Sequence, residues 1–300
     1  MTATTPRQQA DASVDATPVA IDEVETGSGP PGLGVGFWLA VAFLGLIALI
    51  AVLAPWLPFL DDPDAFSRDD RLGPSTDYWF GTDELGRDVF SRTMFGARVS
   101  LQIAVLAVVA GMLVGGSIGL LAGFLGGRID RILSGAMDVL LAFPPLVLAL
   151  FVVAVRGATV ANVVLALSVL SVPGIARIVR ANTVVFANRE FVTAAETLGA
   201  KRSRILVKEI LPNVVPAMLA FSLLIIGLLI IAEGALSFLG LSVADPYPSW
   251  GGILASGRLE LDEAPHIALF TILLMFLTVL SLNVVSDTLQ QRFSVREAAI

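Results

Sequence analysis

Residues Arg189 to Pro212 read REFVTAAETLGAKRSRILVKEILP and form a long polar interruption in a chain that is otherwise mostly apolar. Read as a helix, the stretch places four apolar residues at i, i+3, i+4 and i+7 on one stripe, namely Phe191, Ala194, Ala195 and Leu198. Gly199 is predicted to end this helix, because glycine adopts the left-handed conformation without steric cost. A basic run and a second short helix then lead to Pro212, which opens the next hydrophobic segment. The pattern indicates a docking helix between two membrane spans, offered to a soluble partner.

The composition is typical of an integral membrane protein. Of the 300 residues, 56% are hydrophobic and 15% are charged, with a mean hydropathy of +0.83, whereas a soluble domain averages about 25% charged and 45–50% apolar residues. The net charge of −7 indicates little about nucleic acids, because the acidic residues gather in the N-terminal tail and two polar loops. With no cysteine and one histidine, His266, the sequence excludes disulfides, iron–sulfur clusters and multi-histidine metal sites. We therefore expect neither a metal nor a cofactor in this chain.

Six apolar segments are predicted to span the membrane, which makes the expected fold an all-α integral membrane bundle. The segments are approximately Val35–Leu60, Leu101–Leu125, Ile132–Val155, Val160–Ile175, Val215–Leu239 and Ile267–Val285. In the first, Trp38 and Trp56 lie eighteen residues apart. That spacing is about 27 Å along a helix and matches the two interfacial belts of a bilayer.

The spans define the predicted organisation of the chain. Residues 1–34 lack apolar periodicity and are predicted to be a disordered cytoplasmic tail. Residues 35–100 hold the first span and an extracytoplasmic segment, 101–293 hold the core spans with the docking loop, and 294–300 form a C-terminal tail.

Basic residues predict the orientation. Six spans place both termini on one side, and seven basic residues lie in the stretch around the docking helix: Arg177, Arg180, Arg189, Lys201, Arg202, Arg204 and Lys208. Because cytoplasmic loops carry an excess of lysine and arginine, we expect the docking helix and both termini to be cytoplasmic.

Glycine recurs every four residues in the second span, at Gly111, Gly115, Gly119, Gly123 and Gly127. Such a stripe drifts slowly around one helix face and lets another helix approach closely. The pattern predicts a helix-packing seam. It leaves open whether helices slide along this seam or whether it lines a pathway.

Two further features lie within the predicted spans. Pro144-Pro145 is expected to kink the third span. Glu233, in the fifth span, is an intramembrane carboxylate that either faces a pathway or forms a structural pair with an arginine near the outer surface. Asp138 is expected to reach Arg131 or Arg177.

The sequence lacks a phosphate-binding loop of the Walker A type, which needs Gly-Lys-Ser/Thr. Its only two lysines, Lys201 and Lys208, follow Ala200 and Val207. The predicted spans contain no recognisable catalytic Ser/His/Asp or paired-carboxylate arrangement. The chain is therefore predicted not to be an enzyme, and any ATP hydrolysis must come from another polypeptide.

The docking stretch resembles the EAA loop of the membrane subunits of ABC importers, which holds the coupling helix gripped by the ATPase. The matching positions are Ala194, Ala195, Gly199, Leu211 and Pro212. Thr193 stands where the motif usually has glutamate, and Ile210 falls one place late. The resemblance assigns ATPase coupling to the loop that also contains Phe191, Leu198, Ala200 and Lys201.

Other stretches resemble C-type permease subunits of dipeptide, oligopeptide and nickel ABC importers. They are YWFGTDELGRDVFSRTMFGARVSL at 78–101, ARIVRA at 176–181, EILPNVVPAML at 209–219, and EGALSFLGL followed by PYPSWGG within 233–252. The resemblance covers roughly Val35 to Phe293. It implies a type I ABC importer permease bundle with a cytoplasmic coupling helix, in the cell membrane.

The resemblance also implies the partners. A homologous B-type permease would enclose the translocation path with this chain, two ATPase subunits would bind ATP and Mg²⁺, and an extracytoplasmic binding protein would deliver peptides. Nickel or another small solute is the alternative cargo within the family. A secondary transporter without an ATPase is the alternative outside it, although such proteins tend to show internal repeats and several intramembrane charges.

Overall fold

The computed structural model describes residues 33–241, 243 and 248–298, and within these ranges it is helical without a β-strand. The predicted tail over 1–34 lies outside the described residues except for its last two positions. The elements are α1 (Val35–Leu53), η1 (Ala54–Trp56), α2 (Val89–Leu125), α3 (Gly127–Ala142), α4 (Pro145–Arg156), α5 (Val160–Ala187), α6 (Glu190–Thr197), α7 (Arg202–Arg204), η2 (Ile205–Ile210), α8 (Leu211–Phe238), α9 (Trp250–Gly257), η3 (Arg258–Glu260) and α10 (His266–Ala298).

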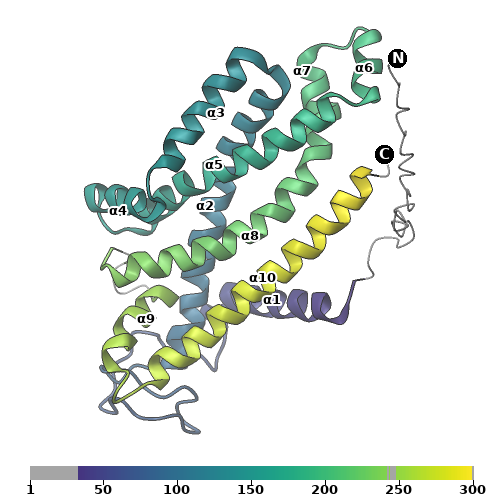
Figure 1. The fold of residues 1–300 in the computed structure, drawn as a ribbon. Helices are drawn as coiled ribbons and strands as arrows, with labels where there is room; N and C mark the ends of the chain where they lie inside the picture. Colours follow the sequence, from purple (N-terminus) through teal and green to yellow (C-terminus); the bar gives the residue numbers. More distant parts are fainter. Residues whose placement is uncertain (1–32, 242, 244–247, 299–300) are drawn as a thin grey trace, which may run out of the picture.

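Long helices run between two ends of the bundle (Figure 1). The short helices α6 and α7 lie at one end, here the α6 end, and α9 lies with the long loop before α2 at the other, the α9 end. In the described chain, five helical runs are long and apolar enough to cross a membrane, and the bent pair α3–α4 makes a sixth if counted as one span. The predicted all-α membrane fold is confirmed.

Two predicted spans are longer than their apolar cores. α2 begins at Val89 rather than near Leu101, because Asp88 caps it: the Asp88 carboxylate accepts hydrogen bonds from the N–H groups of Phe90 and Ser91. α10 continues to Ala298, so residues 294–298, predicted as part of a tail, belong to this helix.

The third predicted span is not one kinked helix. α3 and α4 are bent by 83° at their junction. Pro145 cannot donate a hydrogen bond to the preceding turn, and Pro144 pushes Phe143 into an extended conformation, with φ −80° and ψ 137°. Together the two prolines break the helix rather than bending it.

The core lies where α2, α5 and α8 meet. Its largest cluster of buried residues includes Ile103, Ala107 and Leu167, together with Leu229 and Ile230 of α8. α3 contributes no buried side chain. The bundle is therefore tight around α2 and α5 and loose around α3.

Candidate functional site

The predicted docking helix is α6, which projects at one end of the bundle (Figure 1). Gly199 follows it with φ 79°, in the left-handed region. The Gly199 N–H donates to the Glu196 carbonyl at 2.9 Å, and the Ala200 N–H donates to the Ala195 carbonyl at 3.0 Å. These two bonds form a Schellman motif, in which glycine is the favoured left-handed residue. The predicted helix end at Gly199 is confirmed.

Most of the predicted apolar stripe of α6 is exposed. Phe191 and Ala194 are exposed and Leu198 is 88% exposed, whereas Ala195 is half-buried. The helix is instead anchored by Val192, which is 3% exposed and packs in a cluster of buried residues from α5, η2 and α8. Sequence periodicity missed this anchor. α6 thus packs on the bundle through Val192 and the half-buried Ala195, and its other apolar residues face outward.

A basic hollow of about 540 Å³ lies beside the end of α6. Its lining is Gly199, Ala200, Lys201, Ser203, Arg204, Val207 and Lys208. The side chains of Lys201, Arg204 and Lys208 are exposed, as is that of Thr193 on α6 itself. An exposed apolar helix with a basic border can seat on a partner by burying Leu198 and can be oriented by charge.

From this hollow the chain continues through α7 and η2 into α8 as one uninterrupted helical run. η2 is a π-helical turn, in which the Leu211 N–H donates to the Leu206 carbonyl. Pro212, in the first turn of α8, has no N–H and would clash with a carbonyl four residues earlier, so the wider turn accommodates it. Ile205 and Ile210 are fully buried and anchor the turn. Pro212 opens α8 as predicted, with Leu211 half-buried before it.

The glycine seam of α2 packs against α5. A methyl group placed on Gly115 would lie 2.5 Å from the Val172 carbonyl oxygen, and one on Gly119 would lie 2.5 Å from that of Ala176. Gly111 and Gly123 face Ser171 and Thr183 of the same helix. Gly127 is a correction: it is the first residue of α3, has φ 57° and has open space around it. The seam therefore ends at Gly123.

Glu233 is 1% exposed and lies among serine hydroxyls. The Ser249 hydroxyl donates to its carboxylate at 2.8 Å, the Ser237 hydroxyl at 3.2 Å and the Ser100 hydroxyl at 3.3 Å. These serines come from α2, from α8 and from the residue before α9. Sequence reasoning proposed either a pathway or an arginine pair and missed the serines, which are far apart along the chain.

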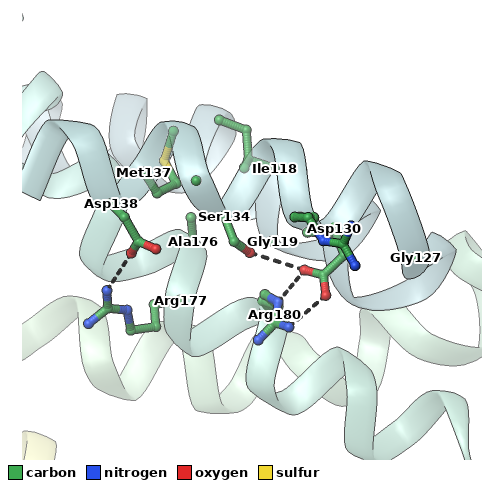
Figure 2. Close-up of a pocket in the computed structure, with 13 residues that line it drawn as sticks. Ile118, Gly119, Gly127, Asp130, Ser134, Met137, Asp138, Ala176, Arg177 and Arg180 are labelled. Carbon is green, nitrogen blue, oxygen red and sulfur yellow. Dashed lines mark hydrogen bonds and ion pairs between the residues drawn. The ribbon is translucent and has the colours of Figure 1, made fainter.

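Two ion pairs connect α3 to α5 (Figure 2). Arg177 donates to Asp138 at 2.9 Å, which confirms one of the two expected partners of Asp138. Arg180 donates to Asp130 at 2.7 Å, and Ser134 donates to the same carboxylate at 3.0 Å. The charged side chains line an open pocket of about 670 Å³ between α2, α3 and α5. α3 therefore contacts α5 through two ion pairs and buries no side chain fully.

The signature FGTDELGRD folds into a compact loop at the start of α2. Asp83 and Arg87 are both buried and form an ion pair at 2.7 Å. Asp83 also accepts hydrogen bonds from the N–H groups of Leu85 and Arg87, each at 2.9 Å. His266 of α10 contacts the Thr82 carbonyl at 3.1 Å. The motif thus ties the loop before α2 to the first residue of α10, a role that its sequence alone did not indicate.

A second charged group lies at this end, where Arg71 donates to Glu260 at 2.7 Å. That hydrogen bond raises the pKa of Arg71 and lowers the pKa of Glu260. Burial raises the pKa of Glu84, and the neighbouring Glu260 raises it further. This end of the molecule therefore holds one carboxyl group with a raised pKa beside another with a lowered pKa.

The sequence is similar to a family of transport proteins and to individual members of it. The model of the family described as "Binding-protein-dependent transport system inner membrane component" matches residues 115–297. The glutathione transport system permease protein GsiD of Pectobacterium atrosepticum is 42% identical over 256 residues, which cover 84% of this chain and 85% of that protein. GsiD of Shigella dysenteriae is 42% identical over 252 residues, which cover 84% and 83%.

Two solved structures have a similar fold. The MetNI methionine ABC transporter, in an inward-facing conformation, matches with a TM-score of 0.54 and 16% identity over 66% of this chain and 94% of that chain. An amino acid ABC transporter with histidines matches with a TM-score of 0.52 and 17% identity over 68% and 94%. At such identities the likeness supports the fold alone.

Proposed function

The chain belongs to the family of binding-protein-dependent transport system inner membrane components and is a permease subunit of an ABC importer; from this premise we propose that it carries peptides across the inner membrane. The observation that carries the choice of cargo is the 42% identity, over 84% of the chain, to permeases named for glutathione transport. Glutathione is a tripeptide, so short peptides are the cargo class. The family implies in general a partner permease, an ATPase and a binding protein.

In this proposal the α6 end is cytoplasmic and docks an ATPase subunit. Leu198 and Phe191 supply apolar surface, and the basic residues of the hollow orient the partner. ATP and Mg²⁺ are bound by two ATPase subunits rather than by this chain. Closure of the ATPase pair pushes on α6, and the continuous run 202–238 carries that displacement toward the α9 end.

The α9 end then faces outward, where a binding protein delivers the peptide. A homologous B-type permease completes the path. The loop before α2, fastened by Asp83 and Arg87, supplies a preformed outer surface.

The test is purification of this chain with its partners in mild detergent, followed by reconstitution into liposomes with the binding protein. We expect co-purification of a second permease and an ATPase, ATP hydrolysis stimulated by the binding protein, and ATP-dependent uptake of radiolabelled glutathione or dialanine. Uptake of Ni²⁺ but of neither peptide would overturn the cargo. Uptake that continues without ATP or any ATPase subunit would overturn the mechanism and favour a secondary transporter.

A further inference from the structure

Glu233 sits at the junction of three separate elements. Its buried carboxylate accepts hydrogen bonds from Ser100 of α2, Ser237 of α8 and Ser249 immediately before α9. The three hydroxyl groups satisfy a buried carboxyl group and thereby connect α2, α8 and the residue before α9 through one side chain.

The same hydroxyls set the start of α9. Ser249 caps α9 by accepting from the Gly252 N–H at 3.0 Å while it donates to Glu233. The Trp250 N–H donates to the Ser100 hydroxyl at 3.0 Å, and the Trp250 indole N–H donates to the Thr93 carbonyl at 2.9 Å. The first turn of α9 is therefore fastened to α8 and to α2 at once.

Packing leaves this turn little freedom. Trp250 is fully buried. A methyl group placed on Gly251 would lie 2.8 Å from the Gly234 Cα and 2.9 Å from the Glu233 carboxylate. Gly251 of α9 thus packs directly against the backbone of α8 at Gly234, the residue that follows Glu233.

The other end of the same helical run belongs to α6. The run 202–238 begins in the basic hollow and packs there with Val192 of α6 through Ile205 and Ile210. A helix rises about 1.5 Å per residue, so a run of this length spans a bilayer and connects the two ends of the bundle. One continuous helical run therefore contacts both α6 and α9.

We propose that Glu233 is a positioning residue which makes α9 move as one body with α8, so that displacement of α6 repositions the outer end of the permease. This inference rests on the proposed function, in which α6 docks the ATPase. It adds that α9 is the element that moves at the α9 end, and that the contact of Glu233 with Ser249 transmits the movement. Glu233 acts here through Ser249 and α9 and not by contact with the cargo.

The test follows α9 during the ATPase cycle. The chain contains no cysteine, so Ser256→Cys places a single thiol in this subunit, on α9 and outside the Glu233 cluster. The purified complex is labelled with a small maleimide without nucleotide and after trapping with ATP and vanadate, and modification of this chain is quantified by mass spectrometry. We expect the labelling rate to differ between the two states.

Variants then remove the hydrogen bond between Ser249 and Glu233. Ser249→Ala removes the hydroxyl that joins α9 to the carboxylate, whereas Ser249→Thr keeps a hydroxyl. Glu233→Gln keeps one acceptor oxygen but removes the charge. Ser222→Ala is the matched control, because Ser222 is a buried serine of α8 whose hydroxyl donates to the Met218 carbonyl of its own helix at 2.8 Å.

The proposal predicts that Ser249→Ala loses the nucleotide-dependent difference in labelling and that Glu233→Gln reduces it, while the complex still assembles and hydrolyses ATP. Ser249→Thr and Ser222→Ala should retain the difference. A purely structural role would lower the yield of complex without moving this readout.

Two outcomes would overturn the inference alone: equal labelling in both states of a parent complex that hydrolyses ATP, or an undiminished difference in Ser249→Ala and Glu233→Gln. A parent chain that assembles with no ATPase would instead overturn the proposed function.

Discussion

Gly115→Ala should destabilise the bundle, and its neighbour Gly116 provides the control. Both glycines are buried in α2. A methyl group on Gly115 would lie 2.5 Å from the Val172 carbonyl oxygen, whereas one on Gly116 would meet only the Met218 sulfur at 3.2 Å. Carbon–oxygen contacts settle at about 3.3–3.6 Å, so α2 and α5 must separate by about 1 Å to accept the first methyl group. The Met218 side chain can rotate away from the second.

The magnitude follows from two opposing terms. Overpacking a tight contact costs about 1–3 kcal/mol, and replacing glycine by alanine inside a helix recovers about 0.5–1 kcal/mol. Gly115→Ala should therefore lower the free energy of unfolding by about 1–2 kcal/mol. Gly116→Ala should leave it unchanged or raise it slightly. Thermal unfolding of the purified complex, followed by tryptophan fluorescence, measures both. Equal melting temperatures for the two variants would refute the argument that the seam is a backbone-to-backbone contact.

Three other predictions concern separate parts of the molecule. Gly199→Val should abolish uptake while the complex still assembles, because a β-branched residue resists φ 79° and shifts the end of α6; normal uptake in this variant would contradict the lever mechanism. Asp130→Arg should lower stability or uptake by breaking the contact with Arg180, and adding Arg180→Asp should restore much of the loss; a double variant as impaired as the sum of the single ones would count against the pair. Glu84→Gln should raise the melting temperature at pH 7 and not near pH 4, because the raised pKa of Glu84 means that its ionised form opposes folding above that pKa; a difference independent of pH would exclude this cause.

Sequence patterns predicted the features that depend on local geometry. The helix end at Gly199 follows from the conformational freedom of one residue, and the contact of Gly115 with α5 follows from a repeat along one helix. A pair of prolines predicted a disturbance at Pro144-Pro145, and the observed break exceeds the predicted kink. Its size depends on how α3 and α4 pack against the rest of the bundle, which local sequence does not specify.

Features that depend on distant residues were missed. Val192 anchors α6 because its neighbours in space, such as Ile205 and Ile210, return from a later segment whose register no periodicity specifies. The hydroxyls around Glu233 come from positions such as Ser100 and Ser249, and serine is too common for its position to draw attention. One local signal existed: Ser249 stands directly before a short apolar helix, as an N-cap residue would.

The glycine seam also limits the relative motion of α2 and α5. Because the glycines of α2 recur every four residues, sliding by less than about 6 Å would bring larger side chains against the backbone of α5. The seam is therefore a close backbone contact in this structure, and sliding along it stays a prediction. α3 is the opposite case: it begins at Gly126-Gly127, both with positive φ and open space, ends at the proline break, and buries no side chain. Segments with few buried contacts move most readily, so we expect α3 to shift relative to α2, α5 and α8. That shift would have to break both ion pairs between α3 and α5, Asp130–Arg180 and Asp138–Arg177.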